Sequence, residues 1–206
     1  MRTSYFYEPS AGHGLPHDPF NAIVAPRPIG WVSTSTVQGG LNLAPYSFFN
    51  AVNYTPPLIA FSSIGHKDTV ANIEATGEFC WNLVTTELGE QMNATSAAVD
   101  TEIDEFELAG LTAAPSRVVS VPHVGQARVV FECRRTQILR LTDASGEDTP
   151  ARMVFGEVVG VHLDESLLDD GVYQTAAADP LLRGGGPADY FRIRGEDRLR
   201  MHRPQP

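Results

Sequence analysis

The stretch from Ala25 to Ser63 constrains the fold of this chain more than any other part of the sequence. Over residues 29–36 the side chains alternate with a period of two, and they change from apolar to hydroxyl-bearing as the chain approaches Gly39-Gly40. This pattern is typical of a β-strand whose polar end opens onto a ligand. Pro56-Pro57 then precedes a second strand-like run at residues 58–61. We therefore expect two strands that flank a segment rich in aromatic and small polar side chains.

The rest of the chain combines short strand-like runs with a few helical segments. The strand-like runs lie at residues 79–84, 118–121, 127–133, 136–141 and 153–161, with a hairpin turn at 143–146. Helices are expected over residues 70–75, from Thr85 through Ala97, and within residues 100–109. Asp68 or Thr69 would cap the first of these helices, and Gly77 would end it. Closely spaced strands with few inserted helices predict a mainly β fold, a closed antiparallel barrel.

Composition and charge exclude several classes of protein. The chain has 206 residues, of which 42% are hydrophobic and 19% charged, as expected for one globular domain. A formal net charge of -10 argues against a nucleic-acid partner, because phosphate backbones require a basic surface. No apolar run approaches the length of a membrane span, and the N-terminal residues lack the regions of a secretory signal. We therefore expect a cytoplasmic protein that has no membrane partner.

The cysteines and the N-terminal histidines do not predict a metal centre. Cys80 and Cys133 lie far apart, each within a strand-like run, so their spacing excludes a CxxC pair and a metal knuckle. We expect two buried free thiols. His13 and His17 have the spacing of metal ligands on a helix, but the Gly and Pro residues around them would break that helix.

A series of short motifs within residues 21–84 gives the chain a family resemblance. The motifs are Arg27-Pro28-Ile29, the hydroxyl run Ser33 to Thr36, Gly40 with Asn42, Ala44 to Phe49, Pro56-Pro57, Lys67-Asp68-Thr69, Asn72-Ile73, Thr76 to Phe79, and Asn82 to Val84. In this order and spacing the segment resembles the flavin reductase-like family of FMN-binding split barrels. The resemblance implies an antiparallel Greek-key split β-barrel with inserted helices and an FMN cofactor.

The resemblance also implies how the chain is organised. Residues 1–20 would form an N-terminal arm, residues 21–165 the split barrel, and residues 166–206 a C-terminal tail that packs on the barrel or on a dimer partner. Relatives place the flavin at or near a subunit interface, so a homodimer is expected.

The candidate cofactor-binding residues follow from the resemblance together with the chemistry of FMN. Charged and hydroxyl side chains suited to the phosphate are Arg27, Ser47, Lys67 and Thr69, and the last two lie at an expected helix start, where free N–H groups attract anions. By resemblance, the ribityl chain and the edge of the flavin ring would be lined by Ser33, Thr34, Ser35, Asn50, Ala51, Val52 and Asn53. Tyr190 is a further candidate on the flavin or substrate side, because Arg183 to Tyr190 is similar to a tail segment of relatives.

No residue is assigned as a catalytic acid or base. In flavin chemistry the cofactor itself accepts the hydride, and the protein supplies binding, orientation and electrostatic tuning. His66, His123 and His162 are isolated in the sequence and are interpreted as structural or surface residues, although His66 lies next to Lys67.

These observations favour an NAD(P)H:flavin oxidoreductase, with NADH or NADPH as the co-substrate and small-molecule flavin as the acceptor. The reduced flavin would be used in place or passed to a partner monooxygenase. Two alternatives remain open at this point: an FMN-binding electron carrier or flavin store without nicotinamide activity, and an FMN enzyme that acts on a small organic substrate.

Overall fold

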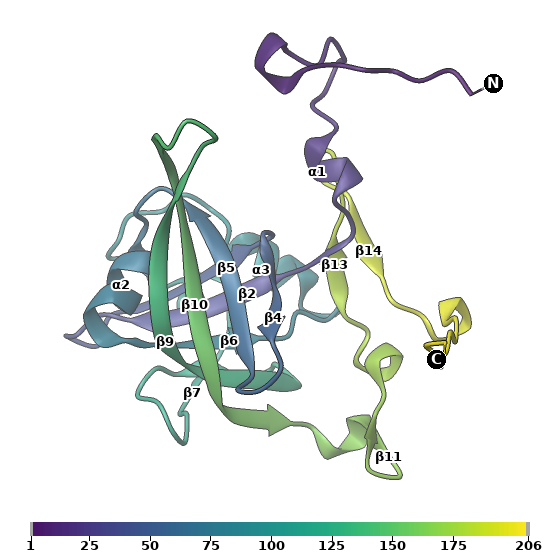
Figure 1. Ribbon diagram of the computed structural model, residues 1–206. Coiled ribbons are helices and arrows are strands. Elements are labelled where there is room, and N and C mark those ends of the chain that lie inside the picture. Colours follow the sequence, from purple (N-terminus) through teal and green to yellow (C-terminus); the bar gives the residue numbers. More distant parts are fainter. Residues whose placement is uncertain (1, 205–206) are drawn as a thin grey trace.

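Seven antiparallel strands form the largest sheet of the structure, a computed structural model that describes residues 2–204 (Figure 1). Their bounds are β2 (Gly30–Ser35), β3 (Leu41–Tyr46), β4 (Phe49–Asn53), β5 (Leu58–Ile64), β6 (Glu78–Asn82), β9 (Val129–Thr142) and β10 (Asp148–Leu163). The strands follow the order β3-β2-β6-β9-β10-β5-β4. This arrangement confirms the predicted mainly β, antiparallel fold.

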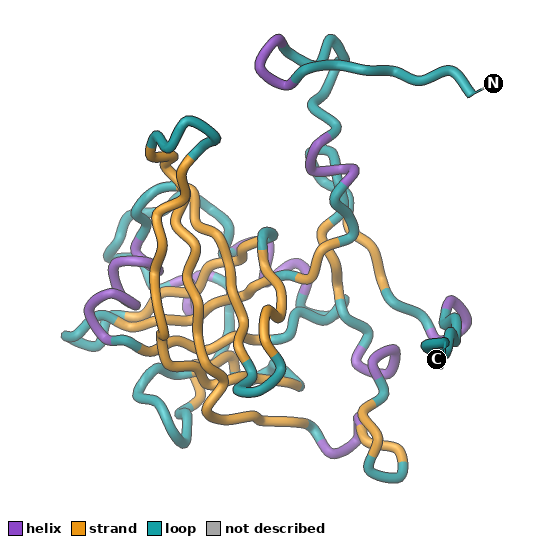
Figure 2. The backbone as a smooth tube through the Cα atoms, viewed as in Figure 1, coloured by secondary structure: helices purple, strands orange, loops and turns teal. Residues whose placement is uncertain are grey.

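The sheet curls until its first strand approaches its sixth. The N–H of Ser62 on β5 donates a hydrogen bond of 2.9 Å to the carbonyl of Phe48, which follows β3. Next to this bond, the ring centroids of Tyr46 and Phe61 lie 4.7 Å apart. The result is a half-barrel and not the closed barrel predicted, because the sheet ends at β4, which pairs only with β5. Its inner face encloses the main hydrophobic core (Figures 1 and 2).

The core depends on close approach between the strands and one helix. Phe61 and Phe79 are fully buried in it, and Val70 and Ile73 of helix α2 (Asp68–Thr76) add two more fully buried side chains. A Cβ atom at Gly156 on β10 would lie 2.3 Å from the Phe79 ring, so the core requires glycine there. Both cysteines are buried free thiols, as predicted.

The predicted helix at residues 70–75 and its end at Gly77 are confirmed as α2, but the predicted cap at Asp68 or Thr69 is wrong, because both residues lie within the helix. The next two helices are shorter than expected. Lys67 occupies the N-cap position of α2 without a side-chain capping bond, and Gly77 ends the helix in the left-handed region at φ 75°. Helix α3 spans only Gly89–Ala94, and helix α4 only Glu105–Leu108. The helix predicted to begin at Thr85 does not begin there, because Thr85 forms a β-bridge with Pro180.

The predicted strand at residues 118–121 is wrong. This segment is an irregular loop, and its backbone N–H groups do not pair with a neighbouring strand. The buried carboxylate of Glu132 on β9 accepts hydrogen bonds from the N–H groups of Arg117, Val118 and Val119. A side chain from elsewhere in the fold therefore satisfies backbone groups that a strand would have paired.

Short elements occupy the two ends of the chain and the loops. The strands are β1 (Arg27–Pro28), β7 (Ala113–Ala114), β8 (His123–Val124), β11 (Leu168–Asp169), β12 (Val172–Tyr173), β13 (Leu181–Arg183) and β14 (Tyr190–Arg192). The helices are η1 (Pro9–Ala11), α1 (Phe20–Ile23), η2 (Glu165–Leu167), η3 (Thr175–Ala178) and η4 (Gly195–Asp197). Strands β1, β13 and β14 form a small sheet, from which the two ends of the chain project away from the half-barrel (Figure 1). Within residues 2–204, no helix is long and apolar enough to cross a membrane.

Candidate functional site

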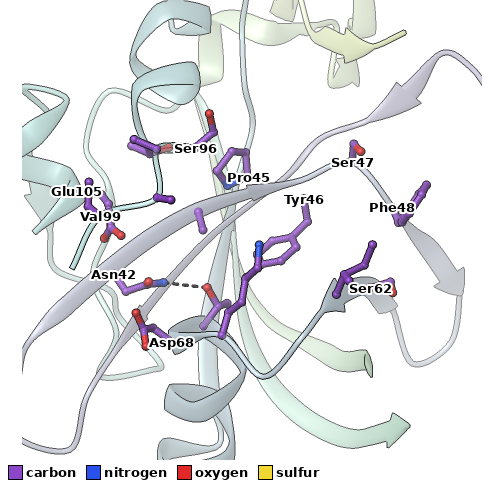
Figure 3. A pocket seen from close by; sticks show the side chains of 17 residues that line it. Asn42, Pro45, Tyr46, Ser47, Phe48, Ser62, Asp68, Ser96, Val99 and Glu105 are labelled. Atoms are coloured by element: carbon purple, nitrogen blue, oxygen red, sulfur yellow. Dashed lines mark hydrogen bonds between the residues drawn. The ribbon is translucent and has the colours of Figure 1, made fainter. Parts of the chain in front are cut away.

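A cleft of about 450 Å³ opens beside the start of helix α2 (Figure 3). Its walls come from β3, from the end of β5, from the segment between α3 and α4, and from α4 itself. The residues that line it are Asn42, Ala44, Pro45, Tyr46, Ser47, Phe48, Ser62, Ile64, Lys67, Asp68, Thr69, Thr95, Ser96, Ala97, Ala98, Val99 and Glu105. Three of the predicted cofactor-binding residues, Ser47, Lys67 and Thr69, therefore meet in one cleft.

A buried polar network holds the start of α2 against the sheet. The side-chain amide of Asn42 donates to the hydroxyls of Thr69 and Thr34, at 2.9 and 3.1 Å. The amide of Asn72 also donates to the Thr34 hydroxyl, at 3.1 Å. These side chains are all at least nine-tenths buried, so the bonds replace lost contacts with water. Thr34, a predicted cofactor-binding residue, therefore does not line the cleft but binds Asn42, which does.

The start of α2 supplies donors for an anion. The first N–H groups of an α-helix have no partner within the helix, and the helix dipole adds partial positive charge at this end. Lys67 lies at the N-cap position with an exposed side chain, and it is the only lysine in the chain. The combination of N–H groups and one ammonium group is suited to a phosphate.

The hydroxyl of Tyr46 is a buried polar group on a residue that lines the cleft. Tyr46 is only 7% exposed, and its hydroxyl makes no hydrogen bond within the described residues. Burial raises the pKa of this phenol, and the nearby hydroxyls of Thr69 and Ser63 oppose that rise. A buried hydroxyl without a partner costs about 1–3 kcal/mol. A phosphate or another polar ligand in the cleft would remove that cost.

The cleft also contains two carboxylates on one side. Glu105 of α4 is 9% exposed and accepts a hydrogen bond of 3.0 Å from the N–H of Leu43. Burial raises the pKa of Glu105, and the nearby charges of Asp104 and Asp68 raise it further. Asp68 and Glu105 thus make one end of the cleft acidic.

A second hollow of about 530 Å³ shares Phe48 with the cleft. Its lining is largely apolar: Ile23, Val24, Ala25, Pro26, Arg27, Pro28, Phe48, Phe49, Asn50, Val52, Ala60 and Met153. Strand β4 forms the edge of the large sheet here, and its residues Asn50, Ala51, Val52 and Asn53 are all exposed. A flat aromatic group could therefore lie on this groove while its polar edge meets the unpaired backbone of β4.

Arg27 was predicted to bind the phosphate, but its side chain is bound to the backbone of this chain. Its guanidinium group is buried and donates to the carbonyls of Asn21, Val24, Ser47 and Gly184. These bonds occupy the group on the side of the second hollow, whereas Lys67 lines the cleft. The structure therefore does not bring the two cations together on one phosphate.

Five further predicted residues line neither hollow: Ser33, Ser35, Ala51, Asn53 and Tyr190. The Ser33 hydroxyl is fully buried and donates to the carbonyl of Pro122 at 2.8 Å, while Ser35 is half-buried at the end of β2. Tyr190 on β14 packs against Arg183, whose guanidinium carbon lies 5.0 Å from the centre of the Tyr190 ring. His66 pairs with Glu74 at 2.7 Å rather than lining the cleft.

Several residues of the cleft were not among the predicted cofactor-binding residues. They are Asn42, Tyr46, Ser62, Asp68, Ser96 and Glu105. For Asn42 and Tyr46 a signal was present, because they lie four residues apart on one strand and therefore share a face. No signal in the sequence connects Glu105 with β3, because the two are joined only by tertiary contact.

Comparison with known proteins gives consistent results over most of the chain. The model of the flavin reductase like domain matches residues 24–182. An uncharacterised protein of Aquifex aeolicus is 37% identical over 185 residues, which cover 87% of this chain and 90% of that protein.

Two solved structures resemble this one over nearly its full length. Nitrilotriacetate monooxygenase component B from Bacillus cereus is 30% identical, with a TM-score of 0.85 over 97% of this chain and 100% of that chain. A 2-nitrobenzoate 2-nitroreductase from Pseudomonas fluorescens is 32% identical, with a TM-score of 0.78 over 90% of this chain and 88% of that chain.

Proposed function

Because this chain belongs to the flavin reductase like domain family, we propose that it is an FMN-dependent oxidoreductase that transfers hydride from NADH or NADPH to flavin. The observation that carries this proposal is the cleft in which the Tyr46 hydroxyl has no partner beside the start of α2. The donors gathered there match a terminal phosphate, and the groove beyond Phe48 matches a flat ring.

The chain offers suitable groups for each part of FMN. Lys67 and the hydroxyls of Tyr46 and Ser47 would hold the phosphate by charge-assisted hydrogen bonds. Thr69 accepts a bond from Asn42 and keeps its own proton free to donate. The exposed backbone of β4 would orient the ring edge, and the apolar groove would exclude water from one face of the ring. When bound, the flavin accepts the hydride, while these residues set its position.

The similarity to a monooxygenase component supports one fate for the reduced flavin. We propose that a partner monooxygenase is a candidate acceptor.

The test uses the purified protein, FMN and each nicotinamide in turn. We expect the protein with FMN to oxidise NADH or NADPH faster than free FMN does, with an absorbance change at the flavin band under anaerobic conditions. A rate no higher than that of free flavin with both nicotinamides would rule out the proposed activity.

The single lysine allows the phosphate site to be tested separately. An amine-acylating reagent followed by peptide mass analysis reports the accessibility of Lys67, because no other side chain carries an ε-amino group. We expect FMN to protect Lys67 and riboflavin, which lacks the phosphate, to leave it reactive. Lys67→Ala should weaken FMN binding by about 1.5–3 kcal/mol, the range for a charged hydrogen bond, whereas Arg135→Ala, on β9 outside the cleft, should not weaken it.

A second candidate function is favoured by the similarity to 2-nitrobenzoate 2-nitroreductase. In this alternative the bound FMN would reduce a small aromatic compound in the apolar hollow beside Met153 and Val52. Anaerobic mixing of the reduced, FMN-loaded protein with nitroaromatic compounds would distinguish the two, because only this alternative expects flavin reoxidation coupled to loss of the compound.

A further inference from the structure

The two ends of the cleft differ in chemistry. Figure 3 shows Asp68, Val99 and Glu105 on one side, Ser47, Phe48 and Ser62 on the other, and Tyr46 between them. The Phe48 side leads to the second hollow, because Phe48 lines both. A ligand whose ring lies in that hollow and whose phosphate reaches Tyr46 and Lys67 would therefore point its phosphate toward the acidic end.

The acidic end of the cleft carries the carboxylates of Asp68 and Glu105 and is lined also by residues 95–99. Asp68 and Glu105 lie close enough for the charge of Asp68 to act on Glu105. Residues 95–99 form the neighbouring wall, and the Thr101 hydroxyl, just beyond that wall, donates to the Asp68 carboxylate at 3.3 Å. This bond ties the segment that follows the wall to Asp68 at the start of α2. A group attached beyond the first phosphate would meet both carboxylates and the wall.

We propose that the acidic end limits the ligand to one terminal phosphate, so that Asp68 and Glu105 make the protein select FMN over FAD. This inference rests on the proposed function, because it takes the cleft to be the phosphate site. The first phosphate is compensated by Lys67, by the N–H groups at the start of α2 and by the Tyr46 hydroxyl. The second phosphate of FAD would have no further cation among the lining residues and would face two carboxylates.

The experiment measures the affinities of the full chain for FMN, FAD and riboflavin by quenching of flavin fluorescence. We expect wild-type protein to bind FMN at least about tenfold more tightly than FAD, a difference of about 1.4 kcal/mol. Glu105→Gln keeps an acceptor for the Leu43 N–H, and Asp68→Asn keeps an acceptor for Thr101. Each variant should raise the affinity for FAD more than that for FMN, narrowing the ratio about threefold or more. Riboflavin binding should be unchanged.

Glu107→Gln is the matched control, because it removes one charge from an exposed position of the same helix outside the cleft. It should leave the FMN to FAD ratio as in the wild type. Retained FMN binding in each variant shows that the variant is folded. Equal binding of FMN and FAD by the wild type, or an unchanged ratio in both Glu105→Gln and Asp68→Asn, would overturn the inference.

If the proposed function itself is wrong, the binding measurements give a different result. In that case no flavin would bind, or riboflavin would bind as tightly as FMN and FMN would not protect Lys67 from acylation. Selection of FMN over riboflavin without selection over FAD would overturn only the present inference.

Discussion

Two buried side-chain atoms within residues 2–204 lack a hydrogen-bond partner, the Tyr46 hydroxyl and Oε1 of Gln91, and only the first lines the cleft. Elsewhere in the barrel, buried polar groups are paired, as in the network of Thr34, Asn42 and Thr69. A buried polar group without a partner lowers stability, and of these two residues only Tyr46 lines the cleft proposed to hold the phosphate. We therefore expect the Tyr46 hydroxyl to contribute to ligand binding and not to the stability of the free protein.

The variant Tyr46→Phe tests whether the hydroxyl serves ligand binding or the stability of the fold. Removal of the unpaired hydroxyl should leave the stability of the free protein unchanged or raise it, while FMN binding weakens by about 0.5–1.5 kcal/mol, the value of one hydrogen bond. Urea unfolding and flavin titration measure the two effects. A loss of stability with unchanged FMN affinity would mean that the hydroxyl serves the fold.

Glu132 is the opposite case, a buried charge with complete partners. Its carboxylate accepts three backbone N–H bonds and contacts Nε2 of His162 at 2.5 Å, and the His162 ring lies 4.6 Å from that of His123. Burial alone would raise the pKa of Glu132, but the bonds from Arg117, His162, Val119 and Val118 outweigh it and lower the pKa to about 2. The charged form is thus favoured by folding.

Because its pKa in the folded state is depressed, Glu132 stabilises the protein above its usual pKa of 4.5, and this contribution is lost as pH falls toward about 2. Glu132→Gln should lower the free energy of unfolding at pH 7 by about 1.5–3 kcal/mol. It should also flatten the loss of stability between pH 4.5 and pH 2. Urea unfolding across this range is the measurement, with the exposed Glu87→Gln as control. Parallel pH profiles for wild type and Glu132→Gln would contradict the assignment.

At the scale of elements, Arg27 joins segments that are far apart in the sequence. It lies on β1, which pairs with β13, and its guanidinium bonds connect carbonyls before β1 with those of Ser47 and Gly184. Burial lowers the pKa of Arg27, and the charge of Arg183 adds to this. One side chain thereby fastens both ends of the chain to the half-barrel.

Arg27→Ala should loosen these ends without unfolding the large sheet. We expect limited proteolysis within residues 2–24 and 184–204 to become faster, because four carbonyls lose their donor. The fragment that contains the seven strands should persist. Arg135→Ala, which removes an exposed arginine from β9, is the matched control and should give the wild-type cleavage pattern.

At the scale of the whole molecule, β4 presents an unpaired and exposed sheet edge, and apolar side chains are exposed beside it. Val52 is 50% exposed and Ile23 71% exposed, and both line the second hollow. The projecting ends add further exposed aromatic residues, among them Phe6 and Phe191. Exposed edges and apolar patches favour association with a further chain.

We therefore predict a homodimer at micromolar concentration, with a mass by light scattering of twice that of the chain. Val52→Lys should favour the monomer, because a charge on an edge strand opposes pairing. Val37→Lys, at an exposed position between β2 and β3, should leave the mass unchanged. A monomeric mass for the wild type would contradict this prediction.

The sequence by itself determined the β architecture and helix α2 with its terminal Gly77, and its family resemblance marked Ser47, Lys67 and Thr69 as candidates for the phosphate. These features depend on local periodicity, on turn residues and on short motifs, which act over a few neighbouring residues. Only the tertiary structure decided the partners of Arg27, the loop bound by Glu132, and the meeting of Tyr46 with Glu105 in one cleft. A hydrogen bond such as that between Leu43 and Glu105 spans 62 residues of sequence, and no local pattern specifies it. Residue type shows what a side chain can bind, whereas the fold decides which of its partners come within reach.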